Sequence, residues 1–142
     1  MRIAVLTSPE SWYLKDLRRA AGNRHEISVC DFSQLITRLG AYAGPTVGHR
    51  EDDLERQNAL LVRSMPPGSL EQVVFRMNAL AQLEKSGCFV LNPPRALETA
   101  IDKYLTLARV AAAGILVPTT VTCQSWQPAM TAFRDLGGDV VV

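Results

Sequence analysis

The stretch NALLVRSMPPGSLEQVVFRMNALAQLEKSGCFVL, residues 58–91, decides the fold. Its first five residues, 58–62, and its last four, 88–91, are short apolar runs of the kind that form buried strands. Between them, residues 69–87 carry apolar positions at helical spacing and end on glycine, which predicts a helix. A strand, a helix and a second strand in this order favour a parallel pair joined by a crossover.

Local signals mark where this helix begins. Pro66 and Pro67 stiffen the preceding loop, because proline fixes φ and lacks a backbone donor. Ser69 offers an N-cap, and Gln72 stands in the capping-box position. The apolar positions of the helix are Leu70, Val73, Val74, Met77, Leu80, Ala81 and Leu83. We expect this face to be core. The alternative is that part of it lies at a subunit interface of a homo-oligomer.

Two further strands are expected upstream, over residues 2–7 and 25–30, because both are short and apolar. Ser8 and Pro9 offer the cap and the first residue of a helix between them. The apolar positions of that helix are Trp12, Leu14, Leu17, Ala20 and Ala21. Strands alternating with helices along residues 1–91 predict an α/β fold, a parallel open sheet of about four strands flanked by helices.

The segment between the second and third strands is less regular. A weaker helix is expected over residues 35–39, and residues 40–57 are expected to be an irregular loop. This loop holds His49, Glu51, Asp52 and Asp53. One histidine beside clustered acids is a weak metal signal, so we favour a solvated loop in which Asp52 or Asp53 caps a short helix. We expect His25 to stand at a strand entrance without a chemical role.

Composition narrows the class of protein. The chain has 142 residues, 47% of them hydrophobic, and a formal net charge of +1. This size fits one domain, or one domain plus a fragment of a second. Interspersed charges argue against nucleic-acid binding, and no apolar run is long enough to cross a membrane. Cys30, Cys88 and Cys123 are far apart and odd in number, so we expect reduced thiols in a cytoplasmic protein.

The pattern changes after Leu91. Asp102 offers an N-cap for a helix that runs to Ala113. Residues 119–122 are β-prone, residues 126–136 are helical, and the chain ends in an apolar strand-like run at 139–142. A domain rarely finishes with the hydrophobic run of its last strand unresolved, so we interpret the chain as a fragment.

Two positively charged residues stand where an anion could bind. Arg63 follows the third strand, and ligands of open α/β sheets bind at the carboxyl ends of strands. Lys103 opens a helix, where the helix dipole disfavours a cation unless a phosphate is bound nearby. The alternative for Arg63 is a surface arginine in an ion pair, and the alternative for Lys103 is a plain surface charge. The turn Thr7–Glu10 lacks GxGxxG and no GxxxxGK[ST] is present, which disfavours a dinucleotide-binding oxidoreductase.

The stretch LNPPRALETAIDKYLTLARVAAAGILVPTT, residues 91–120, resembles the RimK-like and glutathione-synthetase-like ligases of the ATP-grasp superfamily. In these enzymes the N-terminal α/β domain ends in a strand and an Asn-Pro-like turn, and Asp-Lys then opens a helix that runs into G-I-x-x-P-x-T. The chain is most similar to the RimK-type α-L-glutamate ligases. Within them, residues 62–87 are most similar to a subgroup linked to tetrahydromethanopterin-type cofactor synthesis.

The resemblance implies a Rossmann-like pre-ATP-grasp domain over residues 1–98 and the start of a truncated ATP-grasp domain over 99–142. It implies that Lys103 contacts the phosphates of ATP and that Arg63 and Ser64 contact the substrate. It places no catalytic or metal-binding residue within this chain, because the second ATP lysine and the magnesium ligands lie further along the family's sequence.

The implied reaction joins an amino acid, glutamate, to a small-molecule carboxylate through an acylphosphate, with ATP and Mg (or Mn) in the full-length enzyme. We expect none of these cofactors to bind tightly to this fragment. The competing hypothesis is a non-enzymatic α/β module that binds a partner or an anionic small molecule through the loop at Arg63.

Overall fold

A computed structural model describes residues 1–40, 46–50 and 52–142. The chain divides into two compact units, Met1–Glu98 and Thr99–Val142. No helix in the described ranges is long and apolar enough to cross a membrane.

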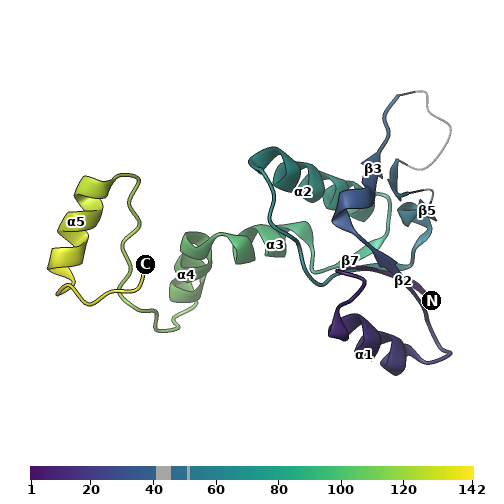
Figure 1. The fold of residues 1–142 in the computed structure, drawn as a ribbon, viewed down its shortest axis with the longest axis horizontal. Coiled ribbons are helices and arrows are strands. Elements are labelled where there is room, and N and C mark those ends of the chain that lie inside the picture. Colours follow the sequence, from purple (N-terminus) through teal and green to yellow (C-terminus); the bar gives the residue numbers. More distant parts are fainter. Residues whose placement is uncertain (41–45, 51) are drawn as a thin grey trace. The chain divides into compact units, whose positions relative to one another are not determined.

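The first unit is built on a four-stranded parallel sheet (Figure 1). Its strands are β1 (Arg2–Leu6), β2 (Glu26–Cys30), β6 (Ala59–Val62) and β7 (Phe89–Leu91). Their order across the sheet is β2-β1-β6-β7, so β1 lies inside the sheet with β2 on one side and β6 on the other. The predicted α/β fold with a parallel sheet of four strands is therefore confirmed.

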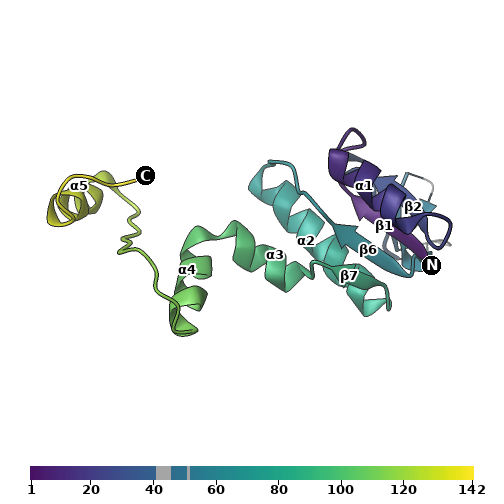
Figure 2. The same cartoon turned by 90° about the horizontal axis from the view of Figure 1, so that it is seen from below.

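Helices cover both faces of this sheet. In Figures 1 and 2, α1 (Trp12–Ala21) lies on one face and α2 (Leu70–Lys85) on the other. Successive residues of a strand point to opposite faces of the sheet, so Ala4 and Leu6 of β1 share one face. Both belong to the same core cluster as Leu80 and Leu83 of α2. The capping box at Ser69, which the sequence predicts, begins α2.

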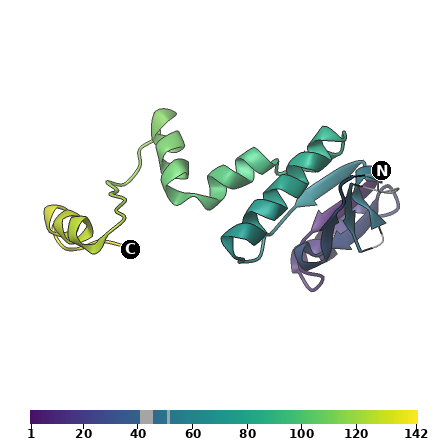
Figure 3. The ribbon, with the colours of Figure 1, turned by 90° about the horizontal axis from the view of Figure 1, so that it is seen from above.

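A second, antiparallel sheet lies on the same side as α2 (Figure 1), and Figure 3 shows the same elements from above. Its strands are β3 (Leu35–Thr37), β4 (Val47–His49) and β5 (Asp52–Asp53), and the short 3₁₀ helices η1 (Phe32–Gln34) and η2 (Leu54–Arg56) flank it.

The helix predicted over residues 35–39 is therefore wrong. Leu35 is buried and pairs with His49 across the β3–β4 ladder, whereas Leu39 is 87% exposed. The apolar positions do not share a helical face, and pairing with β4 satisfies the backbone instead. The irregular loop predicted over 40–57 is also partly wrong, because β4, β5 and η2 lie within it.

Two expected helical faces are more exposed than predicted. The first helix begins at Trp12, because Ser8 to Ser11 form a turn closed by a hydrogen bond from the Ser11 amide to the Ser8 carbonyl. Pro9 is thus outside the helix, and the Trp12 side chain is 64% exposed. In α2, Leu80 is fully buried but Leu70 is 75% exposed, so only part of the predicted apolar face is core.

The second unit contains helices and extended segments. Helix α3 (Pro94–Ile101) spans the boundary between the units, and α4 (Lys103–Ala112) and α5 (Trp126–Asp135) follow. The structure assigns no strand to residues 119–122 or 139–142, which corrects the β-prone assignments there. A strand needs a hydrogen-bonded neighbour, and the described part of this unit offers none.

Candidate functional site

The strand order of the parallel sheet singles out one place on the first unit. The chain passes from β1 to β2 on one side of β1, and later crosses to β6 on the other side. The order reverses between β1 and β6, and ligands of open α/β sheets bind outside the carboxyl ends of the strands at such a reversal. We call this place the β1–β6 edge and define it by Thr7, Arg63 and Ser64, which directly follow the two strands.

Backbone and side-chain hydrogen bonds hold the β1–β6 edge together. The amides of Arg63 and Ser64 both donate to the carbonyl of Leu6, at 3.0 and 3.3 Å. The hydroxyl oxygens of Thr7 and Ser64 lie 3.3 Å apart and share a hydrogen bond. Asn92, just after β7, donates from Nδ2 to the carbonyl of Val62 at 3.1 Å. Residues from three strand ends therefore converge at one edge of the sheet.

Arg63 projects over an aromatic ring. Its guanidinium carbon lies 3.6 Å from the ring centroid of Tyr13, within the range of a cation–π contact. The ring of Tyr13 in turn lies 3.9 Å from that of Trp12, centroid to centroid, at an interplanar angle of 32°. Arg63 forms no ion pair with the described residues, so the surface ion pair considered as its alternative role is not seen.

The loop after Ser64 is supported by a buried arginine. Arg76 of α2 is 7% exposed and donates from Nη1 to the carbonyl of Pro66 at 2.7 Å. Its guanidinium carbon lies 5.5 Å from the ring centroid of Phe32, and its two terminal nitrogens lie 3.0 and 3.2 Å from the place where a Cβ on Gly68 would stand. A side chain at Gly68 would therefore press on this guanidinium.

Lys103 belongs to the second unit, where it is the first residue of α4. The carboxylate of Asp102 caps this helix by accepting from the amide of Leu105 at 2.9 Å. Lys103 is exposed and forms no ion pair with the described part of the chain. The helix dipole disfavours a cation at this position, and the role of Lys103 in contacting an anion stays a prediction.

The predicted loop of His49, Asp52 and Asp53 forms no metal site in the described residues. Glu51 lies outside them. Asp53 accepts from the amide of Glu55 and caps η2, which confirms the capping prediction for this residue. His49 is buried rather than solvated, and its Nε2 accepts from the Asp31 amide at 3.1 Å.

Burial also shifts the titration of groups around this segment. The pKa of His49 is lowered, first because burial disfavours the imidazolium and then because Arg50 is close, while Asp52 and Asp31 act in the opposite sense. Burial, with a smaller contribution from Asp52, raises the pKa of Cys30 to about 11. Both groups are therefore neutral near pH 7, which suits a structural role.

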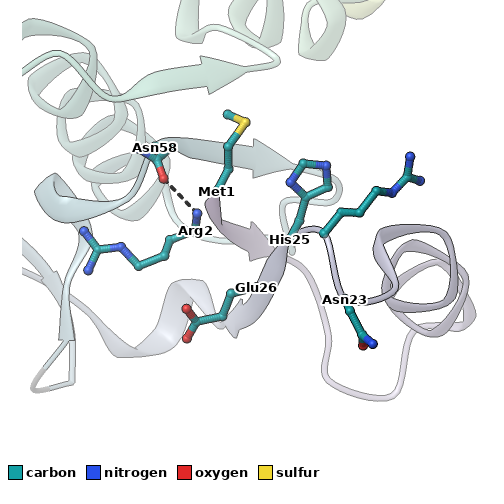
Figure 4. A pocket seen from close by; sticks show the side chains of 7 residues that line it. Met1, Arg2, Asn23, His25, Glu26 and Asn58 are labelled. Atoms are coloured by element: carbon teal, nitrogen blue, oxygen red, sulfur yellow. Dashed lines mark hydrogen bonds between the residues drawn. The ribbon is translucent and has the colours of Figure 1, made fainter.

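A hollow of about 380 Å³ lies at the opposite edge of the sheet (Figure 4). It is lined by Met1, Arg2, Asn23, Arg24, His25, Glu26 and Asn58. The amide of Arg2 donates to Oδ1 of Asn58 at 2.8 Å, and the other side chains stand apart around the opening. This edge carries the amino ends of the strands, so the topology does not favour it as the ligand site.

A larger hollow of about 610 Å³ occurs within the second unit. Its lining residues are Val121, Thr122, Cys123, Gln124, Pro128, Thr131, Ala132, Asp135 and Leu136. The lining contains no lysine or arginine and one acid, Asp135, so it is not suited to binding phosphate or carboxylate groups.

Sequence reasoning predicts Arg63 and Ser64 as substrate contacts, a role that stays a prediction, and it misses the aromatic residues beside Arg63. The sequence places Trp12 among the apolar positions of the first helix and gives no role to Tyr13. The adjacency of two aromatic residues was the available signal, because neighbours one position apart on a helix do not share a face.

No family model matches the chain. The chain is 31% identical over 143 residues to the tetrahydromethanopterin:α-L-glutamate ligase of Methanosarcina acetivorans, covering 96% of this chain and 44% of the relative. It is 34% identical over 122 residues to a probable α-L-glutamate ligase of Serratia proteamaculans, covering 84% of this chain and 39% of the relative.

Solved structures share the fold. A RimK domain ATP-grasp protein from Sphaerobacter thermophilus aligns with a TM-score of 0.71 and 23% identity, covering 96% of this chain and 46% of that one. The ATP-grasp ligase PsnB, in complex with a phosphomimetic variant of a minimal precursor, Mg and ADP, aligns with a TM-score of 0.64 and 23% identity over 95% of this chain and 51% of that one.

The chain spans just under half the length of the curated relatives it matches first, at 44% and 46%. Its similarity to them runs through both units, since 96% to 100% of this chain is aligned. By sequence the chain is therefore related to the N-terminal half of α-L-glutamate ligases, and it shares its fold with ATP-grasp ligases of solved structure.

Proposed function

We propose that this chain is the N-terminal part of an ATP-dependent carboxylate–amine ligase that adds glutamate to an acceptor carboxylate. The observation that carries the proposal is the sequence similarity to α-L-glutamate ligases along nearly the whole chain. In the proposed reaction, the γ-phosphoryl group of ATP passes to the acceptor carboxylate. The amine of glutamate then attacks the acyl carbon, phosphate leaves, and the amine loses a proton.

The two units take different parts in this proposal. Residues 1–98 form the pre-ATP-grasp domain, where Arg63 and Ser64 hold the acceptor at the β1–β6 edge. Arginine suits this role because its planar donors match a carboxylate. Residues 99–142 form the beginning of the ATP-grasp domain, where Lys103 contacts ATP phosphates. Residues that bind magnesium and the rest of ATP belong to the part of the family's sequence that this chain does not match.

The acceptor in this proposal is a reduced pterin that carries a carboxylate side chain. The support is the 31% identity to a ligase that acts on tetrahydromethanopterin. Other relatives are named as probable α-L-glutamate ligases, and these names specify no acceptor.

The proposal is tested on the protein encoded by the whole reading frame that contains these 142 residues. The purified protein is incubated with ATP, MgCl₂, glutamate and tetrahydromethanopterin, and the products are followed by mass spectrometry and by release of ADP. We expect a glutamylated pterin and one ADP for each amide formed. ATP hydrolysis without amide formation, or a reading frame that supplies no further nucleotide-binding residues, would overturn the proposal and favour the non-enzymatic module.

Lys103 is tested separately with a matched control. Lys103→Ala should raise the KM for ATP or lower kcat at least tenfold, because a charge-assisted contact with phosphate is lost. Lys85→Ala, a change of the same size at the exposed end of α2, should leave both constants unchanged. Equal effects of the two substitutions would contradict the assignment of Lys103.

A further inference from the structure

A nearly buried hydroxyl at the β1–β6 edge has a single partner. Thr7 directly follows β1 and is only 5% exposed. Its Oγ1 lies 3.3 Å from Oγ of Ser64, and no other described residue forms a hydrogen bond with the Thr7 hydroxyl. The amide of Thr7 donates to the carbonyl of Cys30 at 3.1 Å, which fixes the backbone of Thr7 beside the end of β2. The Thr7 hydroxyl is therefore held in place against Ser64.

The burial of Thr7 favours one direction for the hydrogen bond between the two hydroxyls. A buried O–H group that finds no acceptor destabilises the folded state. Ser64 is exposed, so water can accept its proton. The proton of Thr7 has only Oγ of Ser64 as an acceptor among the described residues. Thr7 is therefore favoured as the donor of this bond and Ser64 as its acceptor.

This direction determines what Ser64 can offer to a ligand. A serine hydroxyl has one proton to donate and lone pairs with which to accept. When Oγ of Ser64 accepts from Thr7, its own proton points away from Thr7 and is available to a ligand. A hydroxyl that already accepts one hydrogen bond is polarised, which strengthens the bond that it donates. Ser64 is thus prepared to donate to an anionic oxygen, and it adjoins Arg63, whose guanidinium only donates.

We propose that Thr7 is a positioning residue for the acceptor carboxylate: Thr7 donates to Ser64, and Ser64 donates to the carboxylate. This inference rests on the proposed function, which supplies the acceptor and its contact with Ser64. It adds Thr7 and gives the Ser64 hydroxyl a direction, so that the edge selects a ligand oxygen over a group that donates. The present distance of 3.3 Å is long for two hydroxyls, and it should shorten when the carboxylate is bound.

The test measures binding of tetrahydromethanopterin by calorimetry, without ATP or glutamate, to the protein encoded by the whole reading frame. Thr7→Val keeps nearly the same shape but lacks the hydroxyl, so it should weaken binding about three- to tenfold. In turnover, the KM for tetrahydromethanopterin should rise by the same factor while kcat stays nearly unchanged. Thr7→Ser keeps the hydroxyl and should bind like the unchanged protein. Thr37→Val makes the same change at an exposed position of β3 and should have no effect.

A double-mutant cycle separates positioning from a general effect on the fold. Ser64→Ala removes the group that contacts the carboxylate and should weaken binding about tenfold or more. In the Ser64→Ala background, Thr7→Val should cause no further loss, because Thr7 acts only through Ser64. A merely structural role of Thr7 would weaken binding equally in both backgrounds. Melting curves of each variant check that it is folded.

The outcomes keep this inference apart from the proposed function. If tetrahydromethanopterin binds and the two substitutions are coupled, but no glutamylated product forms, Thr7 keeps its role and the ligase proposal fails. If product forms but Thr7→Val leaves the dissociation constant and the KM unchanged, the ligase stands and the inference is overturned. An equal loss on Thr7→Val with and without the Ser64 hydroxyl also overturns it. A complete lack of tetrahydromethanopterin binding would overturn both.

Discussion

Arg76 of α2 donates a hydrogen bond of 2.7 Å to the carbonyl oxygen of Pro66, and this contact ties the helix to the loop that follows the β1–β6 edge. The arginine is almost fully buried, so the bond forms away from water. A buried charge-assisted hydrogen bond is stronger than a neutral one. The position of the loop after Arg63 and Ser64 therefore depends on Arg76. Among the described residues, Arg76 forms no hydrogen bond with Arg63 or Ser64.

Removing Arg76 should destabilise the first unit. Arg76→Ala leaves the Pro66 carbonyl without its donor and should lower the free energy of unfolding by about 1.5–3 kcal/mol. Arg18→Ala removes an exposed arginine from α1 and serves as the control, with an expected change within about 0.5 kcal/mol. Urea unfolding followed by circular dichroism measures both, and equal values for the two variants would contradict the role given to Arg76.

Two leucines of α2, Leu70 and Leu80, should differ sharply in their contribution to stability. Leu80 is fully buried in the core, so Leu80→Ala should lower the free energy of unfolding by about 2–5 kcal/mol through lost burial and a cavity. Leu70 lies in the same helix but is mostly exposed, and Leu70→Ala should cost less than about 1 kcal/mol. A large cost at Leu70 would mean that this side chain is covered in solution, as in a homo-oligomer, and sedimentation would then show association.

The capping box of α2 gives a local test. The Ser69 hydroxyl accepts from the Gln72 amide, and Gln72 reaches back to accept from the Ser69 amide at 3.0 Å. Ser69→Ala should therefore lower the free energy of unfolding by about 1 kcal/mol. Ser11, the N-cap of α1, makes no side-chain capping bond, so Ser11→Ala should lower the free energy of unfolding by less. Thermal melts measure both variants.

His49 should make the stability of the first unit depend on pH. Burial lowers the pKa of His49 below its usual value of 6.5, so the unfolded chain takes up a proton before the folded chain does. The free energy of unfolding should therefore fall as the pH drops below about 6.5, towards the lower pKa of the folded state. The measurement is urea unfolding between pH 5 and pH 8.

Substitution separates this histidine from other titrating groups. His49→Gln should flatten the slope below pH 6.5 relative to the unchanged chain, even if it lowers stability at every pH. His25→Gln, at the only other histidine, should keep the slope. Identical slopes for the two variants would show that His49 does not cause the dependence.

The three cysteines should react at different rates. Burial raises the pKa values of the Cys30 and Cys88 thiols, so little thiolate forms and access is poor. Cys123 is only partly buried. A disulfide reagent at pH 8 should label one thiol quickly in the folded chain and three after denaturation. Fast labelling of a second thiol would contradict the packing of Cys30 or Cys88.

Sequence reasoning succeeded where the signal is local. The capping box at Ser69 lies within four residues, and the parallel strands are short apolar runs that need no knowledge of their partners. It failed at Leu35, because the choice between helix and strand was made by pairing with His49, fourteen residues away. Single-sequence periodicity contains no information about such a partner.

The candidate site was predicted only in part for the same reason. Arg63 and Ser64 were predicted from their position after a strand, which is a topological rule, and their role as substrate contacts stays a prediction. Their neighbours Trp12 and Tyr13 come from a helix fifty residues earlier, and only the fold brings them together. Lys103 was predicted from its place at a helix start and from a family resemblance, and its role stays a prediction.

The parallel direction of the strands has a practical consequence for experiments on immobilised protein. Met1 adjoins the amino end of β1, and its carbonyl accepts from the amide of Glu26 beside the hollow of Figure 4. The β1–β6 edge lies at the other end of the same strand. An affinity tag or sensor linker attached ahead of Met1 therefore leaves Thr7, Arg63 and Ser64 facing the analyte, which makes amino-terminal coupling the orientation of choice for surface-based binding assays.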